Sequence, residues 1–114
     1  MNTSPLGTYP VFVKHLTKNR SEGIEGLLHA AIGMSGESGE VLDIIKKQWV
    51  FSKAIDMDKL KNEAGDVLFY LQLLCNQMGV TLEEIAALNI EKLSARYPNG
   101  YSNEAAIARV DGIT

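Results

Sequence analysis

The strongest structural signal in this sequence is the helical spacing of apolar residues in two long segments. Residues 22–50 carry apolar side chains at positions 24, 27, 28, 31 and 32 and again at 41, 42, 44, 45 and 49; residues 58–78 carry them at 60, 67, 68, 71, 74, 75 and 78. Recurrence every three or four residues is typical of an α-helix with one face in a core. No segment shows the strict alternation of a half-buried strand, so the sequence predicts an all-α fold, most simply a four-helix bundle.

Two shorter helices are expected to complete this fold. Residues 9–18 are compatible with a short first helix that has Pro10 in its first turn. Thr81-Leu82-Glu83-Glu84 is a capping box, which predicts a fourth helix that stops before Pro98. Residues 102–110 are expected to form either a short last helix or a tail.

Composition places the chain among small globular proteins. Its 114 residues, 46% hydrophobic and 22% charged, fit one domain over 1–114, with a core at about 9–97 and a turn and tail at 98–114. The net charge of −3 argues against a protein that coats nucleic-acid phosphates. Cys75 lies in an apolar run, as expected of a small core side chain in a reducing compartment. With no signal-peptide pattern and no run long enough to span a bilayer, we expect a cytoplasmic protein that binds neither a nucleic-acid polymer nor a membrane.

The first long segment is unusually rich in glycine. Gly33, Gly36 and Gly39 fall three residues apart inside it. Each interior glycine costs about 1 kcal/mol relative to alanine. Small residues here favour close approach of another helix or of a ligand. A helix broken near residues 33–36 is the competing interpretation.

Two acidic motifs lie within the two long segments. Glu37-Ser38-Gly39-Glu40 and Glu63-Ala64-Gly65-Asp66 each place two carboxylates three residues apart, on one side of a helix. If these helices pack side by side, four carboxylates converge. Because like charges repel at this distance, we expect a bound cation to neutralise them. Oxygen ligands favour Mg²⁺ or another hard cation, which usually recruits phosphate groups. The alternative is two solvated helix faces that never meet.

Aromatic side chains offer candidates for contact with a base. Trp49 and Phe51, at the end of the first long segment, fit either a stacking surface for a base or a hydrophobic plug at the end of a bundle. His29, two turns before Glu37, fits either the core or the surroundings of a ligand. One cysteine and two histidines are too few for a typical zinc cluster, and no glycine-rich phosphate loop is present.

Basic and amide side chains offer candidates for contact with phosphate. Three lysines follow the first acidic motif: Lys53 and the pair at 46–47. Their position fits either a basic rim that binds phosphate or positive charges that compensate the dipole at the C-terminal end of the helix. Asn89, Lys92 and Arg96 share one face of the fourth predicted helix. That face is suited to phosphate contact or to simple solvation.

The order of these motifs resembles the MazG-like, all-α nucleoside triphosphate pyrophosphohydrolases. The likeness covers roughly residues 25–101 and rests on three stretches: Gly36–Val41, Glu63–Tyr70 and Asn89–Pro98. The family's fuller motif often has a glutamate at the place that Gly36 holds here. This departure indicates a short, compact subtype.

The resemblance implies a metal-dependent hydrolase. The implied metal ligands, which are also the catalytic residues, are Glu37, Glu40, Glu63 and Asp66, with Mg²⁺ as cofactor and Mn²⁺ as the alternative. The implied contacts to the nucleotide come from Asn89, Lys92, Arg96, Lys53, Tyr70 and Trp49.

The resemblance also implies a reaction and an assembly. A nucleoside triphosphate would be cut between its α and β phosphates, giving a monophosphate and pyrophosphate, to remove non-standard or surplus nucleotides. The protein would be a homodimer or a dimer of dimers, as the apolar residues on several faces of so small a chain also suggest. The alternatives are a related hydrolase of dUTP or of a phosphoribosyl nucleotide, and a non-enzymatic helical interaction module.

Overall fold

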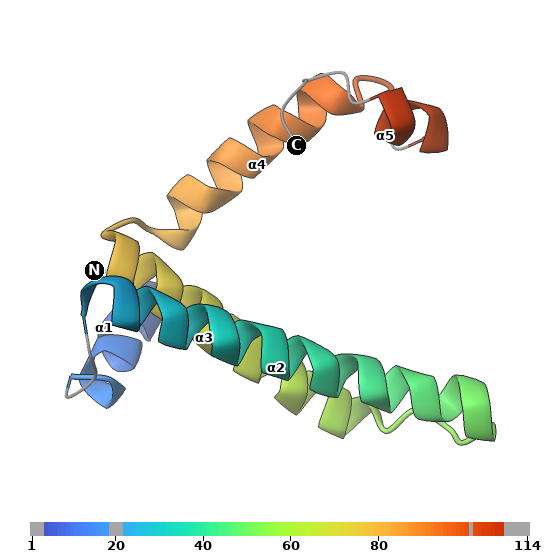
Figure 1. The fold of residues 1–114 in the computed structure, drawn as a ribbon, viewed down its shortest axis with the longest axis horizontal. Coiled ribbons are helices and arrows are strands. Elements are labelled where there is room, and N and C mark those ends of the chain that lie inside the picture. Colours follow the sequence, from blue (N-terminus) through green and yellow to red (C-terminus); the bar gives the residue numbers. More distant parts are fainter. Residues whose placement is uncertain (1–3, 19–21, 101, 109–114) are drawn as a thin grey trace. The chain divides into compact units, whose positions relative to one another are not determined.

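The computed structural model describes residues 4–18, 22–100 and 102–108, and helices account for most of them. In chain order these are α1 (Pro5–Leu16), α2 (Gly23–Phe51), α3 (Met57–Met78), α4 (Leu82–Arg96) and α5 (Asn103–Ala108) (Figure 1). The described ranges contain no strand, so the predicted all-α class is confirmed. Within them, no helix has both the length and the apolar character needed to cross a membrane.

The chain divides into two compact units, Met1–Gly79 and Val80–Thr114. The first unit contains α1, α2 and α3, and the second contains α4 and α5. The prediction of a single domain over 1–114 stays a prediction. Positions 109 and 110 of the expected last helix lie outside the described residues.

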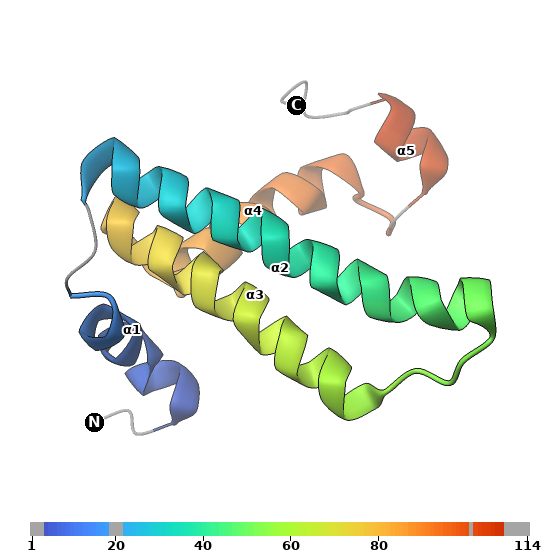
Figure 2. The same cartoon turned by 60° about the horizontal axis from the view of Figure 1, so that its bottom comes forward.

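Helices α2 and α3 form a long antiparallel hairpin, joined by residues 52–56 (Figures 1 and 2). Helix α2 is continuous through its glycines, so the alternative of a break near residues 33–36 is wrong. Asp56 caps α3, because its side chain accepts a hydrogen bond from the Lys59 backbone N–H at 3.1 Å. Gly79, with a φ of 72°, ends α3 in the left-handed conformation that glycine adopts without strain.

The core of the first unit lies where the three helices meet. Val13 of α1, Ala30 of α2 and Leu73 of α3 form its fully buried centre. Four partly buried side chains surround this centre: Tyr9, Phe69, Tyr70 and Leu74. Cys75 is also buried, as expected of a core side chain, and burial raises the pKa of its thiol.

Helix α1 begins four residues earlier than residue 9, the predicted start of the core. Ser4 caps it and Pro5 occupies its first position, where a missing N–H costs nothing. Pro10 therefore lies inside the helix and not in its first turn. The carbonyl of Pro10 accepts a hydrogen bond from Asn76 Nδ2 at 3.1 Å, which ties α1 to α3. The buried Gln72 supports Asn76, because its Nε2 donates to Asn76 Oδ1 at 2.9 Å.

Candidate active site

Three carboxylates meet between α2 and α3. Glu37 of α2 and Glu63 and Asp66 of α3 each offer an oxygen, and these oxygens lie within 4.8 Å of one another. Glu37 and Glu63 are half-buried, whereas Asp66 is exposed. Glu40, the fourth predicted acidic residue, lies outside this group, exposed and nearly one turn further along α2.

The carboxylates shift one another's protonation. The pKa of Glu37 is raised above its ordinary value of 4.5, first by partial loss of solvent and then by the negative charge of Asp66. A hydrogen bond between the Glu37 and Glu63 side chains adds to the rise, since two carboxyl groups can share such a bond only when one is protonated. The charges of Glu63 and Glu40 raise it further. Glu40 thus acts on the group electrostatically from outside it.

This arrangement fits a hard divalent cation. All three groups donate oxygen, which suits Mg²⁺ or Mn²⁺ and does not suit a metal that prefers sulfur. A cation would offset the negative charges of Asp66, Glu63 and Glu40 that raise the Glu37 pKa.

An aromatic cluster lies on the same helical seam. Gly33 is one turn before Glu37 on α2, and Tyr70 is one turn after Asp66 on α3. The Tyr70 ring lies so close to the Gly33 backbone that a Cβ at position 33 would overlap ring carbons. The ring centroid of His29 is 5.9 Å from that of Tyr70. Tyr70 is therefore fixed beside the acidic group, and His29 is placed next to it.

Tyr9 is a neighbour of the acidic group that the sequence analysis did not single out. It lies on α1, and its pKa is raised first by burial and then by the negative charge of Asp66. Its ring also stacks on Phe12, with centroids 6.0 Å apart. No local pattern could have paired residues 9 and 66, because their proximity depends on how α1 packs on α3.

Trp49 and Lys53 are not brought to the acidic group within the first unit. Twelve residues separate Glu37 from Trp49 on one continuous helix, which is about 18 Å along its axis. Trp49 is 81% exposed, so it does not plug the end of the hairpin. Lys53 is exposed in the connection between α2 and α3.

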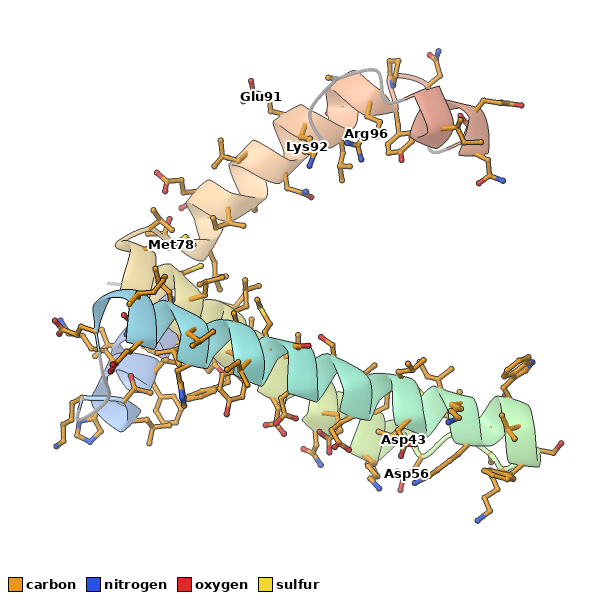
Figure 3. All side chains as sticks on the ribbon, in the orientation of Figure 1. Asp43, Asp56, Met78, Glu91, Lys92 and Arg96 are labelled. Atoms are coloured by element: carbon orange, nitrogen blue, oxygen red, sulfur yellow. The ribbon has the colours of Figure 1, made fainter. Side chains whose placement is uncertain are left out.

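The remaining predicted contacts lie on α4, in the second unit. Asn89 and Lys92 are exposed and Arg96 is half-buried. Lys92 and Arg96 project from one side of α4, and Glu91 projects from the other (Figure 3). The Arg96 guanidinium carbon is 6.0 Å from the centre of the Tyr97 ring. Lys92 and Arg96 thus share one side of α4, and contact of this side with phosphate stays a prediction.

Comparison with known families matches residues 27–101 to the MazG nucleotide pyrophosphohydrolase domain. The match spans the acidic group, the aromatic cluster and the polar side of α4, and the chain belongs to this family. A relative, the Gene 37 protein of Mycobacterium phage L5, is 34% identical over 83 residues, which cover 69% of this chain and 73% of the relative. No solved structure matches the chain.

Proposed function

We propose that this protein is a Mg²⁺-dependent nucleoside triphosphate pyrophosphohydrolase that cleaves between the α and β phosphates. The observation that carries the proposal is the convergence of Glu37, Glu63 and Asp66 from two helices. Membership of the nucleotide pyrophosphohydrolase family supports the substrate class. The products would be a nucleoside monophosphate and pyrophosphate, and the role would be removal of non-standard or surplus nucleotides from the cytoplasmic pool.

In the mechanism that we propose, the carboxylates hold the metal and direct a water molecule to the phosphate. Glu37, Glu63 and Asp66 would bind Mg²⁺, or Mn²⁺ in its place, with Glu40 close enough to add its charge. The bound cation would neutralise phosphate oxygens and lower the pKa of a coordinated water. One of the four carboxylates would accept the proton of the attacking water. Substitution of each carboxylate by its amide, one at a time, distinguishes the two roles. Loss of a metal ligand should weaken Mg²⁺ binding, whereas loss of the proton acceptor should lower kcat and leave Mg²⁺ binding in place.

The substrate contacts form a separate part of the proposal. Asn89, Lys92 and Arg96 would hold the triphosphate, because stabilisation of phosphate charge dominates this chemistry. The shared side of Lys92 and Arg96 supports this assignment. Tyr70 would contact the nucleoside from its fixed place beside Asp66. Trp49 and Lys53 are further proposed contacts, tested by alanine variants with KM as the readout, and the active form would be a homo-oligomer.

The test is product analysis on a panel of nucleotides. Purified protein is incubated with the common NTPs and dNTPs, with dUTP and with a phosphoribosyl nucleotide, in Mg²⁺, in Mn²⁺ and in EDTA. Monophosphate and pyrophosphate in equal amounts, with no reaction in EDTA, is the expected result. A diphosphate with inorganic phosphate as products would contradict the proposed bond. Cleavage of the phosphoribosyl nucleotide alone would favour the related hydrolase, and no cleavage of any compound would favour an interaction module.

A further inference from the structure

Helix α1 brings a tyrosine to the core side of the acidic group. Tyr9 is half-buried and packs against the buried centre of the first unit, as Tyr70 of α3 also does. On α3, Asp66, Tyr70 and Leu73 follow one another at intervals of four and three residues, so they lie along one side of the helix. This side of α3 leads from the acidic group to the core, and Tyr9 packs at its core end.

The backbone of α1 beside Tyr9 is held by α3 itself. Asn76 Nδ2 donates a hydrogen bond to the carbonyl of Pro10 at 3.1 Å. Gln72 orients Asn76 in turn, because it is only 1% exposed and its Nε2 donates to Asn76 Oδ1 at 2.9 Å. Buried polar side chains linked in this way favour one arrangement of the two helices. The helix that carries Asp66 therefore also sets the position of Tyr9.

The Tyr9 hydroxyl is a hydrogen-bond donor that lacks an acceptor in its own unit. The negative charge of Asp66 contributes to the raised pKa of Tyr9, so this carboxylate acts on the hydroxyl through space. No hydrogen bond joins the two groups, and within the described residues of the first unit the hydroxyl bonds to no other group. A phenol in this state is protonated at neutral pH and has one hydrogen bond to donate. An oxygen bound beside Asp66 would accept it.

We propose that Tyr9 is a substrate-binding residue whose hydroxyl donates a hydrogen bond to an oxygen of the α-phosphate. A cation held by the acidic group would bring phosphate oxygens next to Asp66. Tyr9 packs on the same core as Tyr70, the proposed nucleoside contact, and the phosphate nearest the nucleoside is the α-phosphate. This inference rests on the proposed function, and it adds a residue that lies outside the range 27–101 matched by the family.

A neutral donor suits this position. A lysine or arginine next to Asp66 would form an ion pair with its carboxylate and so compete with the cation for it. The tyrosine hydroxyl carries no charge, so it binds a phosphate oxygen and leaves Asp66 to the metal. Because hydrogen bonds to charged oxygens are stronger than those between neutral groups, loss of this one should weaken binding at least tenfold.

The test compares how the full chain binds the two reaction products in Mg²⁺, by isothermal titration calorimetry. The probes are the nucleoside monophosphates of the common bases and inorganic pyrophosphate. Tyr9→Phe should weaken monophosphate binding at least tenfold and leave pyrophosphate binding unchanged, since pyrophosphate does not contain the α-phosphate. Its melting temperature should also stay unchanged, because the ring that stacks on Phe12 remains.

Thr8→Val is the matched control, because it also removes one hydroxyl group from α1. Thr8 is exposed, and its hydroxyl donates to the backbone carbonyls of Ser4 and Pro5. Both product affinities should therefore equal those of wild type. The rise in melting temperature that Mg²⁺ causes should be the same in Tyr9→Phe as in wild type, since Tyr9 is not among the carboxylates that would hold the cation.

Three results would overturn the inference. They are an unchanged monophosphate affinity in Tyr9→Phe, an equal loss of both product affinities, and a wild type that binds no monophosphate in Mg²⁺. None of these measurements needs turnover, so the inference and the proposed reaction can fail separately. A wild type that cleaves nucleotides, with an unchanged monophosphate affinity in Tyr9→Phe, would overturn the inference alone. A wild type that cleaves none, with the tenfold loss in Tyr9→Phe, would support the inference and overturn the reaction.

Discussion

Substitution of Gly33 by alanine should destabilise this protein, although alanine is the better helix former. The Tyr70 ring lies where the new Cβ would be, and Tyr70 is itself held by Phe69, whose ring centroid is 5.0 Å away, and by His29. Forced repacking of a side chain costs about 1–3 kcal/mol. The gain in helix propensity returns about 1 kcal/mol. We expect a net loss of about 1 kcal/mol.

Gly36→Ala is the matched control, since it lies on the same helix and its added Cβ would meet nothing within 4 Å. It should gain about 1 kcal/mol, so the two variants should differ by about 2 kcal/mol. Urea unfolding followed by circular dichroism, in EDTA and at one protein concentration, measures both. In a Tyr70→Ala background the ring is gone, and Gly33→Ala should then stabilise. Equal stabilisation by Gly33→Ala and Gly36→Ala in the wild-type background would refute the close packing of Tyr70 on α2.

Three further outcomes are expected. In EDTA, the stability of Glu37→Gln relative to wild type should grow as pH rises. The folded-state pKa of Glu37 is raised, so the contribution of its protonated carboxyl group to the free energy of unfolding is complete below about pH 4.5 and is lost as pH rises through the raised value. A difference between the two proteins that stays constant with pH would contradict this. Lys92→Ala should lower kcat/KM at least tenfold and leave the melting temperature unchanged. Glu91→Ala, on the other side of α4, should leave both kcat/KM and the melting temperature unchanged. A fall in melting temperature with full activity would show that Lys92 has a structural role. Leu73→Ala should cost about 2–5 kcal/mol in urea unfolding, because Leu73 is only 1% exposed; a cost below 1 kcal/mol would place the core elsewhere.

The helices could be predicted where their signals are local. The capping box set the start of α4, since the Thr81 side chain accepts from the Glu84 backbone N–H at 3.0 Å. The spacing of apolar residues gave α2 and α3 to within one residue at each end. The start of α1 was missed because Pro10 was assigned to a first turn. The carbonyl of Pro10 accepts a hydrogen bond from Asn76, a contact between α1 and α3 that no local pattern reveals.

The acidic group could be predicted only in part for a similar reason. The spacing of three residues put Glu63 and Asp66 on one side of α3, and both join the group. Residues three apart on a helix still differ by about 60° around its axis, and on α2 that difference takes Glu40 out of the group. The proximity of Tyr9 depends on the packing of α1 against α3, which the spacing within either helix does not encode.

The central claim, that these carboxylates bind one cation, is tested most directly by the shift in melting temperature that Mg²⁺ causes in Asp66→Asn. Wild type should melt at a higher temperature in Mg²⁺ than in EDTA, because binding to the folded state stabilises it. Asp66→Asn should lose most of this shift. In EDTA the melting temperature of Asp66→Asn should equal or slightly exceed that of wild type. The corresponding gain in the free energy of unfolding is on the order of 1 kcal/mol or less, since Asp66 is exposed.

Asp58→Asn provides the control in the same experiment, since Asp58 is exposed on α3 and is not part of the group. It should keep the full Mg²⁺ shift of wild type. An Asp66→Asn protein that also keeps the full shift would contradict the proposed metal site.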